Sequence, residues 1–128
     1  MATSDFFAHS YDEARSKFLN TSQSVGAILT QHALPNHCGP NGEALFIDVA
    51  QLGAVNPKSL LVLISGTHGV EGFCGSGCQV GYLADRVYEA LPADAGVMLV
   101  HALNPFGFAW LRRVNEANVD LNRNSNLQ

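Results

Sequence analysis

The segment Leu60-Leu61-Val62-Leu63-Ile64-Ser65-Gly66-Thr67-His68-Gly69-Val70-Glu71-Gly72 joins an apolar run to a glycine-rich loop. The run from Leu60 to Ile64 is apolar on both faces, which is typical of an inner strand in a covered sheet. In open α/β sheets, ligands bind beyond the carboxyl ends of the strands. The segment therefore predicts a buried strand in an α/β protein, with a candidate functional loop at its carboxyl end.

Further elements are expected on both sides of this segment. Ser10 and Glu13 have the spacing of a capping box, and a broken helical pattern follows them and runs out near Ala33. Periodicity and turn residues predict four more elements: a strand over 45–49, a helix over 78–91 that Pro92 ends, a strand over 97–100, and one or two helical turns over 108–113. Strand, helix and strand in this order favour a parallel α/β sheet.

Composition limits the class of protein. A chain of 128 residues with 47% hydrophobic and 14% charged residues fits one globular domain. Seven basic and eleven acidic residues give a net charge of −4, and only Arg112 and Arg113 are adjacent, so we expect no nucleic-acid binding. No apolar run approaches the roughly 18 residues of a membrane span. The sequence shows no secretory signal, and three cysteines read as free thiols, so a cytoplasmic location is expected.

The glycine-rich loop contains a candidate metal-binding pair. His68 and Glu71 form the pattern H-x-x-E, which offers a nitrogen and a carboxylate oxygen three residues apart. Zinc takes such ligands, and catalytic zinc usually has three protein ligands and a water. The alternative is a glycine-rich connection whose His and Glu are merely exposed.

A second polar cluster lies near the end of the chain, in Asp120-Leu121-Asn122-Arg123-Asn124. An Arg side chain can hold a carboxylate with two hydrogen bonds, and Asn adds a donor and an acceptor. The preceding Arg112-Arg113 pair could stabilise an oxyanion that forms when water attacks an amide. The alternative is a solvated polar loop without a ligand.

Four motifs follow one another along the chain: His68-Gly69-Val70-Glu71, Asn104-Pro105-Phe106-Gly107, Arg113 and Val119–Asn124. In this order they resemble the zinc carboxypeptidase superfamily, which includes the succinylglutamate desuccinylase and aspartoacylase branch. The closest likeness is to a bacterial branch of uncharacterised zinc-carboxypeptidase-like proteins, and it covers about residues 10–124. The resemblance implies an α/β fold: a three-layer sandwich with a mostly parallel or mixed central sheet.

By this resemblance, His68 and Glu71 are the first two ligands of Zn²⁺. Arg113 polarises the scissile carbonyl, with the adjacent Arg112 as the alternative, and Asn122 and Arg123 hold the free carboxylate of the substrate. The implied activity is zinc-dependent hydrolysis of an amide bond in a peptide or an N-acyl amino acid, by attack of zinc-activated water.

The chain also departs from the superfamily pattern. Members carry a third ligand, a His, and a general-base Glu downstream of the Asn-Arg motif, whereas this chain ends at Gln128 and has Asn124-Ser125 where an aromatic residue is usual. Residues 1–128 are therefore expected to be the N-terminal part of a single catalytic domain, truncated before the site is complete. The alternative from a different class is a non-catalytic fragment that self-associates into a homo-oligomer.

Three further features have competing interpretations. His101 ends a predicted strand, and a hydrogen-bonded structural role is favoured over metal binding. Cys74 and Cys78 are four residues apart and could offer soft ligands, but small buried side chains are favoured. The glycines within Gly75–Gly81 could form a dinucleotide-binding loop, which is disfavoured because eleven residues separate it from Ile64.

Overall fold

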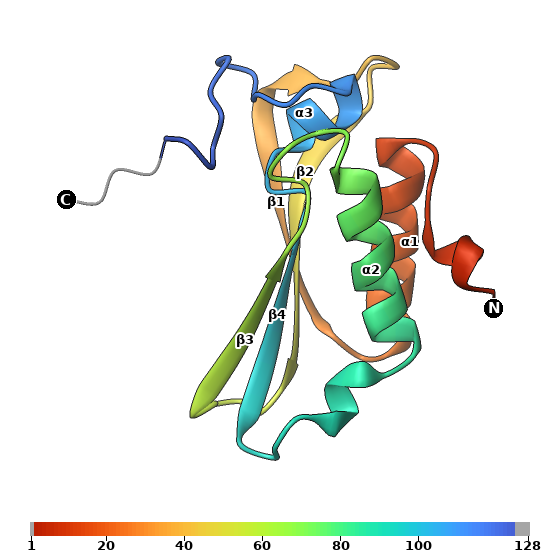
Figure 1. The fold of residues 1–128 in the computed structure, drawn as a ribbon, viewed down its shortest axis with the longest axis vertical. Coiled ribbons are helices and arrows are strands. Elements are labelled where there is room, and N and C mark those ends of the chain that lie inside the picture. The colour runs from red at the N-terminus through yellow and green to blue at the C-terminus, as the bar shows by residue number, and fades with distance from the viewer. Residues whose placement is uncertain (1, 125–128) are drawn as a thin grey trace.

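The computed structural model describes residues 2–124 as one mixed sheet with helices packed against it (Figure 1). The strands are β1 (Ile28–Cys38), β2 (Ala44–Gly53), β3 (Ser59–Ile64) and β4 (Ala95–His101). The helices are α1 (Tyr11–Ser24), α2 (Gly72–Ala84) and α3 (Pro105–Trp110), with 3₁₀ turns η1 (Thr3–Phe6) and η2 (Val87–Ala90). None of the helices within residues 2–124 has the length and apolar character that crossing a bilayer requires.

The sheet has the strand order β1-β2-β4-β3. Strand β2 is antiparallel to both β1 and β4, whereas β3 and β4 are parallel and are connected through α2. The predicted α/β class with a mixed sheet is thus confirmed. Helices α1 and α2 cover one face of the sheet, so these two layers account for most of the part of the chain that the structure describes (Figure 1).

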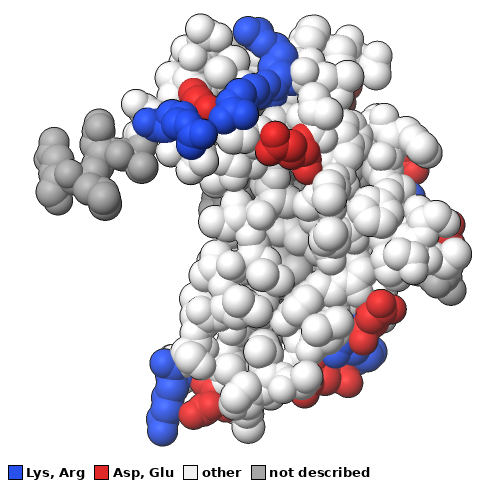
Figure 2. All heavy atoms as spheres, in the orientation of Figure 1, with Lys and Arg blue, Asp and Glu red and all other residues white. Residues whose placement is uncertain are grey.

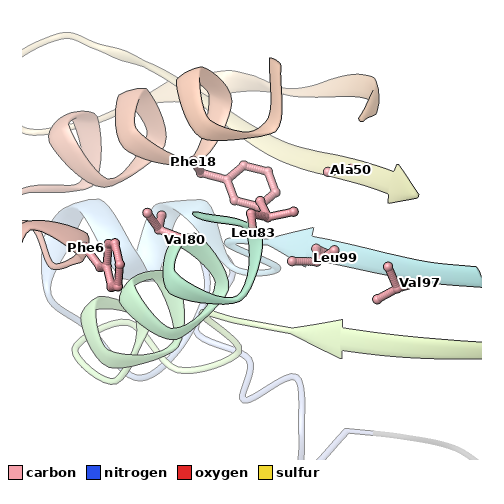
Figure 3. Close-up of a cluster of buried hydrophobic side chains, with 7 residues drawn as sticks. All are labelled: Phe6, Phe18, Ala50, Val80, Leu83, Val97 and Leu99. Atoms are coloured by element: carbon pink, nitrogen blue, oxygen red, sulfur yellow. The ribbon is translucent and has the colours of Figure 1, made fainter. Parts of the chain in front are cut away.

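The main hydrophobic core lies between the two long helices and the sheet (Figure 3). Its buried members come from η1, α1, α2, β2 and β4: Phe6, Phe18, Ala50, Val80, Leu83, Val97 and Leu99. Each large apolar side chain contributes about 1.5–3 kcal/mol when it is fully buried. A second cluster lies at the carboxyl end of β4, where Phe108 of α3 packs edge-on against Tyr11 of α1. This cluster anchors the end of the sheet where the predicted functional loop lies.

The prediction that 60–64 is an inner strand is wrong for the described residues, because β3 is an edge strand that pairs only with β4. Val97 and Leu99 of β4 point toward the helices, and alternation along the paired strands directs Leu60, Val62 and Ile64 to the opposite face. These three side chains are 48%, 44% and 54% exposed. The strand is apolar on both faces, as predicted, but nothing in residues 2–124 covers the face that carries these three side chains.

The helical pattern predicted to reach Ala33 is also wrong beyond Ser24, where α1 ends. Gly26 has a positive φ of 77°, which reverses the chain, and the following residues form β1 along β2. Val25 and Leu29 have helical spacing, but both pack against the core from outside a helix. Pairing with β2 therefore overrides a local spacing that fits a helix equally well.

The capping box is confirmed in part. The Ser10 hydroxyl accepts a hydrogen bond from the Glu13 amide at 3.1 Å, and α1 begins at the next residue. The Glu13 carboxylate accepts from the amide of His9 at 2.9 Å instead of from that of Ser10. The second hydrogen bond of the motif thus comes from an amide one residue earlier than predicted, that of His9.

Helix α2 begins at Gly72, six residues before the predicted start, and ends at Ala84, before η2. The glycines proposed for a dinucleotide loop lie inside this helix, which argues against that alternative. A Cβ at Gly77 would collide with the Phe7 ring, and one at Gly81 would lie 2.9 Å from the ring of Phe6. These glycines allow the N-terminal segment to pack closely against α2, and they do not form a phosphate-binding turn.

Two buried polar pairs connect the helices with the sheet. Arg15 of α1 donates to both carboxylate oxygens of the fully buried Asp48, at 2.7 and 3.2 Å. His101 lies beside Asp48 in the sheet register, contacts the Ser76 hydroxyl at 2.8 Å and stacks on the Phe18 ring. The expected structural role of His101 is confirmed.

Candidate metal centre

The loop after β3 is attached to the loop after β4 by backbone hydrogen bonds. The carbonyl of Ser65 accepts from the amide of Leu103 at 2.9 Å, and the carbonyl of Gly66 accepts from the amide of Asn104 at 2.8 Å. Gly66 has a φ of 70°, and a Cβ there would lie 2.9 Å from Ala102 Cα. The two strand ends are thus held side by side, as expected for a binding site at the carboxyl edge of parallel strands.

Gly69 and Asn104 connect this loop to α3 and to the arginine pair. The amide of Gly69 donates to the carbonyl of Arg112 at 2.9 Å, and a Cβ at Gly69 would collide with the carbonyl oxygens of Arg112 and Gly107. The buried Asn104 side chain caps α3 by accepting from the Gly107 amide at 2.9 Å. This close backbone approach requires glycine at position 69 and fixes the position of the adjacent His68.

His68 is the centre of the site, because both of its ring nitrogens face carboxylates. Its Nδ1 lies 3.2 Å from Oε2 of Glu71, and its Nε2 lies 3.0 Å from Oδ1 of Asp120. A neutral imidazole carries one N–H and can therefore donate to only one of them. In either neutral tautomer, the second nitrogen therefore faces its carboxylate with a lone pair, in a position where a metal ion could bind both groups.

Asp120 is the residue that sequence reasoning missed. Its Oδ1 contacts His68, its Oδ2 accepts from Arg113 Nε at 2.9 Å, and its carboxylate also caps the turn formed by Asn122 and Arg123. The hydrogen bond from His68 and then that from Arg113 hold the pKa of Asp120 well below its usual range. A carboxylate that binds the second nitrogen of a metal-ligating His is a recurrent feature of metal sites. The sequence did contain a signal for this role, because Asp120 belongs to the same motif as Asn122 and Arg123.

The side chains of His68 and Glu71 lie close to the spacing of two zinc ligands. Two ligand atoms at roughly 2.0–2.2 Å from a tetrahedral ion lie about 3.3–3.6 Å apart. The 3.2 Å between His68 Nδ1 and Glu71 Oε2 is only slightly shorter than this separation. In the tautomer whose proton lies on Nε2, Asp120 accepts that proton and the Nδ1 lone pair is free for a metal. Within residues 2–124 no group of three or more His, Cys, Asp or Glu side chains could hold a metal, so the described residues offer two ligands.

The predicted substrate-binding residues lie at the same end of the molecule. Arg113 is brought to His68 through Asp120, whereas Arg112 contributes its backbone carbonyl to the loop. Asn122 and Arg123 are exposed, and their amides contact Asp120. Figure 2 shows basic and acidic side chains at the end where α3 and the segment after it lie, and further charged groups at the opposite end of the molecule. The expected departure at Ser125 and the chain end at Gln128 lie outside the described residues.

The fold is similar to that of several solved structures. A candidate carboxypeptidase from Burkholderia mallei has a TM-score of 0.56 at 21% identity, covering 92% of this chain and 32% of its own. A candidate metallopeptidase from Shewanella amazonensis has a TM-score of 0.54 at 18% identity, covering 85% and 38%. A glutaminyl cyclase from Fimbriiglobus ruber has a TM-score of 0.51 at 10% identity, covering 77% and 41%. The chain thus has the fold of one part of these proteins and spans less than half the length of each.

At the level of sequence, no curated protein matches the chain. A family match covers residues 7–126, which include the H-x-x-E loop, the arginine pair and the Asp120 motif. Because this match extends over almost the whole chain, the protein belongs to the family described as "Protein of unknown function (DUF2817)".

Proposed function

We propose that this chain forms part of the active site of a zinc-dependent hydrolase that cleaves an amide bond beside a free carboxylate. The observation that carries the proposal is the placement of His68 between two carboxylates, with Glu71 on Nδ1 and Asp120 on Nε2. The fold shared with a candidate carboxypeptidase and a candidate metallopeptidase supports it. The substrate is a peptide or a small N-acyl amino acid.

Each residue of the site has a separate proposed task. His68 and Glu71 bind zinc, and Asp120 keeps the His68 ring in the tautomer that leaves Nδ1 free. The guanidinium of Arg113 stabilises negative charge on the carbonyl oxygen under attack. Asn122 and Arg123 hold the substrate carboxylate, because an Arg fork and an amide match its two oxygens. Zinc in such a site supplies Lewis-acid polarisation of the carbonyl and activation of water.

The complete site requires groups beyond those described. Two ligands are fewer than the three usual for catalytic zinc, so we propose that a third ligand and a general base come from outside residues 2–124. Residues 1–128 are proposed to be the N-terminal part of one catalytic domain, which agrees with the 32–41% of the length of the similar structures that this chain covers. The proposed location is the cytoplasm, which the free cysteines support.

Calorimetric titration of zinc into the metal-free chain tests the metal site directly. We expect one zinc per chain, with binding lost in His68→Ala and in Glu71→Ala. The matched control is His32→Ala, which removes an exposed imidazole from β1 and is expected to leave binding unchanged. Zinc binding that is indifferent to both site substitutions would contradict the proposal. Binding lost in all three variants would indicate misfolding, which circular dichroism detects.

Kinetic measurements on the zinc-loaded protein that carries this chain test the roles of the arginines. Arg113→Gln is expected to lower kcat about 10²-fold, because it removes a donor to the developing oxyanion. Arg123→Gln is expected to raise KM for substrates with a free carboxylate and to leave KM for the matching carboxamides unchanged. Equal effects of Arg123→Gln on both substrate classes would exclude a carboxylate-binding role.

A further inference from the structure

Helix α2 carries two thiols on its exposed side. Cys74 and Cys78 are one turn apart, both are exposed, and neither forms a disulfide. Residues four apart on a helix have Cβ atoms about 5–6 Å from each other, on the same face. The opposite face of α2 is buried through Ser76, Val80 and Leu83, so the two thiols share the solvent-facing side. The expectation that both cysteines are small buried side chains is therefore wrong.

The spacing argues against a disulfide between these thiols. A disulfide brings Cβ atoms to about 3.8 Å, whereas the helical spacing is about 5–6 Å, so the bond would distort the first turns of α2. Those turns follow directly from Glu71 and pack through Gly72 against the Phe108 ring. A metal ion between the two sulfurs needs no such approach, because two metal–sulfur bonds span the gap.

The surroundings of Cys78 are mostly apolar. Cys78 lines a shallow pocket of about 340 Å³ at the edge of β3, together with Leu63, Gln79 and Tyr82, and no charged side chain lines it. Burial raises the pKa of the Cys78 thiol, and the neighbouring Cys74 thiol raises it further. The pocket thus presents the Cys78 sulfur to a ligand and has no charged side chain in its lining.

The donor set selects among metals. Thiolate ligands select soft ions such as Cu(I), whereas Mg²⁺ and Ca²⁺ prefer oxygen. Structural zinc requires four ligands, and residues 2–124 provide no third His, Cys, Asp or Glu beside this pair. The candidates that remain are soft ions for which two sulfur ligands are sufficient.

We propose that Cys74 and Cys78 form a two-thiolate site for a soft, two-coordinate metal ion of the Cu(I) class. On binding, two S–H bonds break, two metal–sulfur bonds form, and two protons are released to solvent, with no change in oxidation state. This site is separate from that of His68 and Glu71, whose nitrogen and oxygen ligands are harder.

Anaerobic titration with Cu(I), in competition with the chromogenic chelator bicinchoninate, tests the proposal. The chain is expected to withdraw one Cu(I) per molecule from the chelator and to release two protons per ion at neutral pH. Cys74→Ser and Cys78→Ser are each expected to weaken binding by about 100-fold or more, since a hydroxyl is a poor ligand for a soft ion. Cys38→Ser is the matched control, because it removes an exposed thiol from β1 and is expected to change nothing.

Two results would overturn the proposal. One is a chain that cannot compete with the chelator while its circular dichroism shows the folded state. The other is Cu(I) binding of unchanged strength in the Cys74→Ser and Cys78→Ser variants. His68→Ala is expected to retain Cu(I) and lose zinc, and Cys78→Ser to do the reverse, so failure at one site is distinguishable from failure at the other.

Discussion

Among the individual residues, Asp120 is the one on which the geometry of the site depends most. It contacts the Nε2 of His68 and the guanidinium of Arg113 through different oxygens. Asp120→Asn keeps the size of the side chain and removes its charge. We expect zinc affinity to fall about 10–100-fold, the range found for partners of metal-ligating His residues.

Calorimetry on Asp120→Asn and on Asp85→Asn separates a local effect from a change in net charge. Asp85 is an exposed carboxylate just after α2, and its substitution is expected to leave zinc affinity unchanged. If both variants bind zinc as the unsubstituted chain does, then Asp120 does not hold His68 for the metal.

His101 makes the stability of the fold depend on pH. Burial, and secondarily the charge of Arg15, lower its pKa from 6.5 to about 3. Between these values the unfolded chain binds a proton at this residue and the folded chain does not, so protons favour unfolding. The free energy of unfolding is expected to fall by about 1.4 kcal/mol per pH unit from this residue as the pH drops below about 6.5.

Urea denaturation at pH 7 and at pH 4.5 measures this contribution. His101→Gln is expected to reduce the difference in unfolding free energy between the two pH values, whatever its effect at pH 7. His32→Gln, which alters an exposed imidazole, is expected to retain the full difference. A difference equally large in both variants would assign the acid sensitivity to other groups.

Among the secondary-structure elements, the loop between β3 and α2 is held by backbone contacts that tolerate no side chain at Gly69. A methyl group there would press on the carbonyls of Arg112 and Gly107. Gly69→Ala is expected to destabilise the fold by about 1–3 kcal/mol, as overpacking does. It is also expected to weaken zinc binding, because the loop that carries His68 must shift.

The matched control for this variant is Gly26→Ala. Gly26 has a positive φ, but a Cβ there meets no atom within 4 Å. We expect a cost of about 1–2 kcal/mol from the backbone conformation alone, with zinc affinity retained. Thermal unfolding and calorimetry of the two variants distinguish strain in a remote turn from displacement of the site. Equal zinc affinity in both variants would show that the loop accommodates a side chain.

For the molecule as a whole, the uncovered face and free edge of the sheet are the dominant feature. Leu60, Val62 and Ile64 extend along an edge strand that contains no charged residue. An apolar edge of this kind promotes association with another chain. We therefore continue to predict that the chain forms homo-oligomers.

Val62→Lys tests this prediction. A charge at the centre of β3 is expected to lower the apparent mass at high protein concentration, measured by size-exclusion chromatography with light scattering. Val87→Lys, at an exposed position of η2 outside β3, is the control and is expected to associate as the unsubstituted chain does. A chain that is monomeric at high concentration without any substitution would contradict the prediction.

The amino-acid pattern predicted the two strands near the functional loop and the position of that loop. The runs at 60–64 and 97–100 are short, apolar and bounded by turn residues, and both form strands in the structure. The H-x-x-E spacing placed His68 and Glu71 together, because three residues in one tight turn bring side chains to the same side. Local patterns of this kind depend on neighbours in the chain and need no knowledge of the tertiary fold.

Contacts between distant parts of the chain determined the remaining features. Residues 28–33 form a strand because β2 offers a ladder of hydrogen bonds, although the local helical pattern was predicted to reach Ala33. Asp120 reaches His68 across 52 positions in the sequence, a pairing that no local spacing specifies. Whether β3 lies inside a sheet or at its edge depends on which chain segments pack beside it. Each of these is settled by long-range pairing and packing, whose free energy outweighs the small local preferences of the backbone.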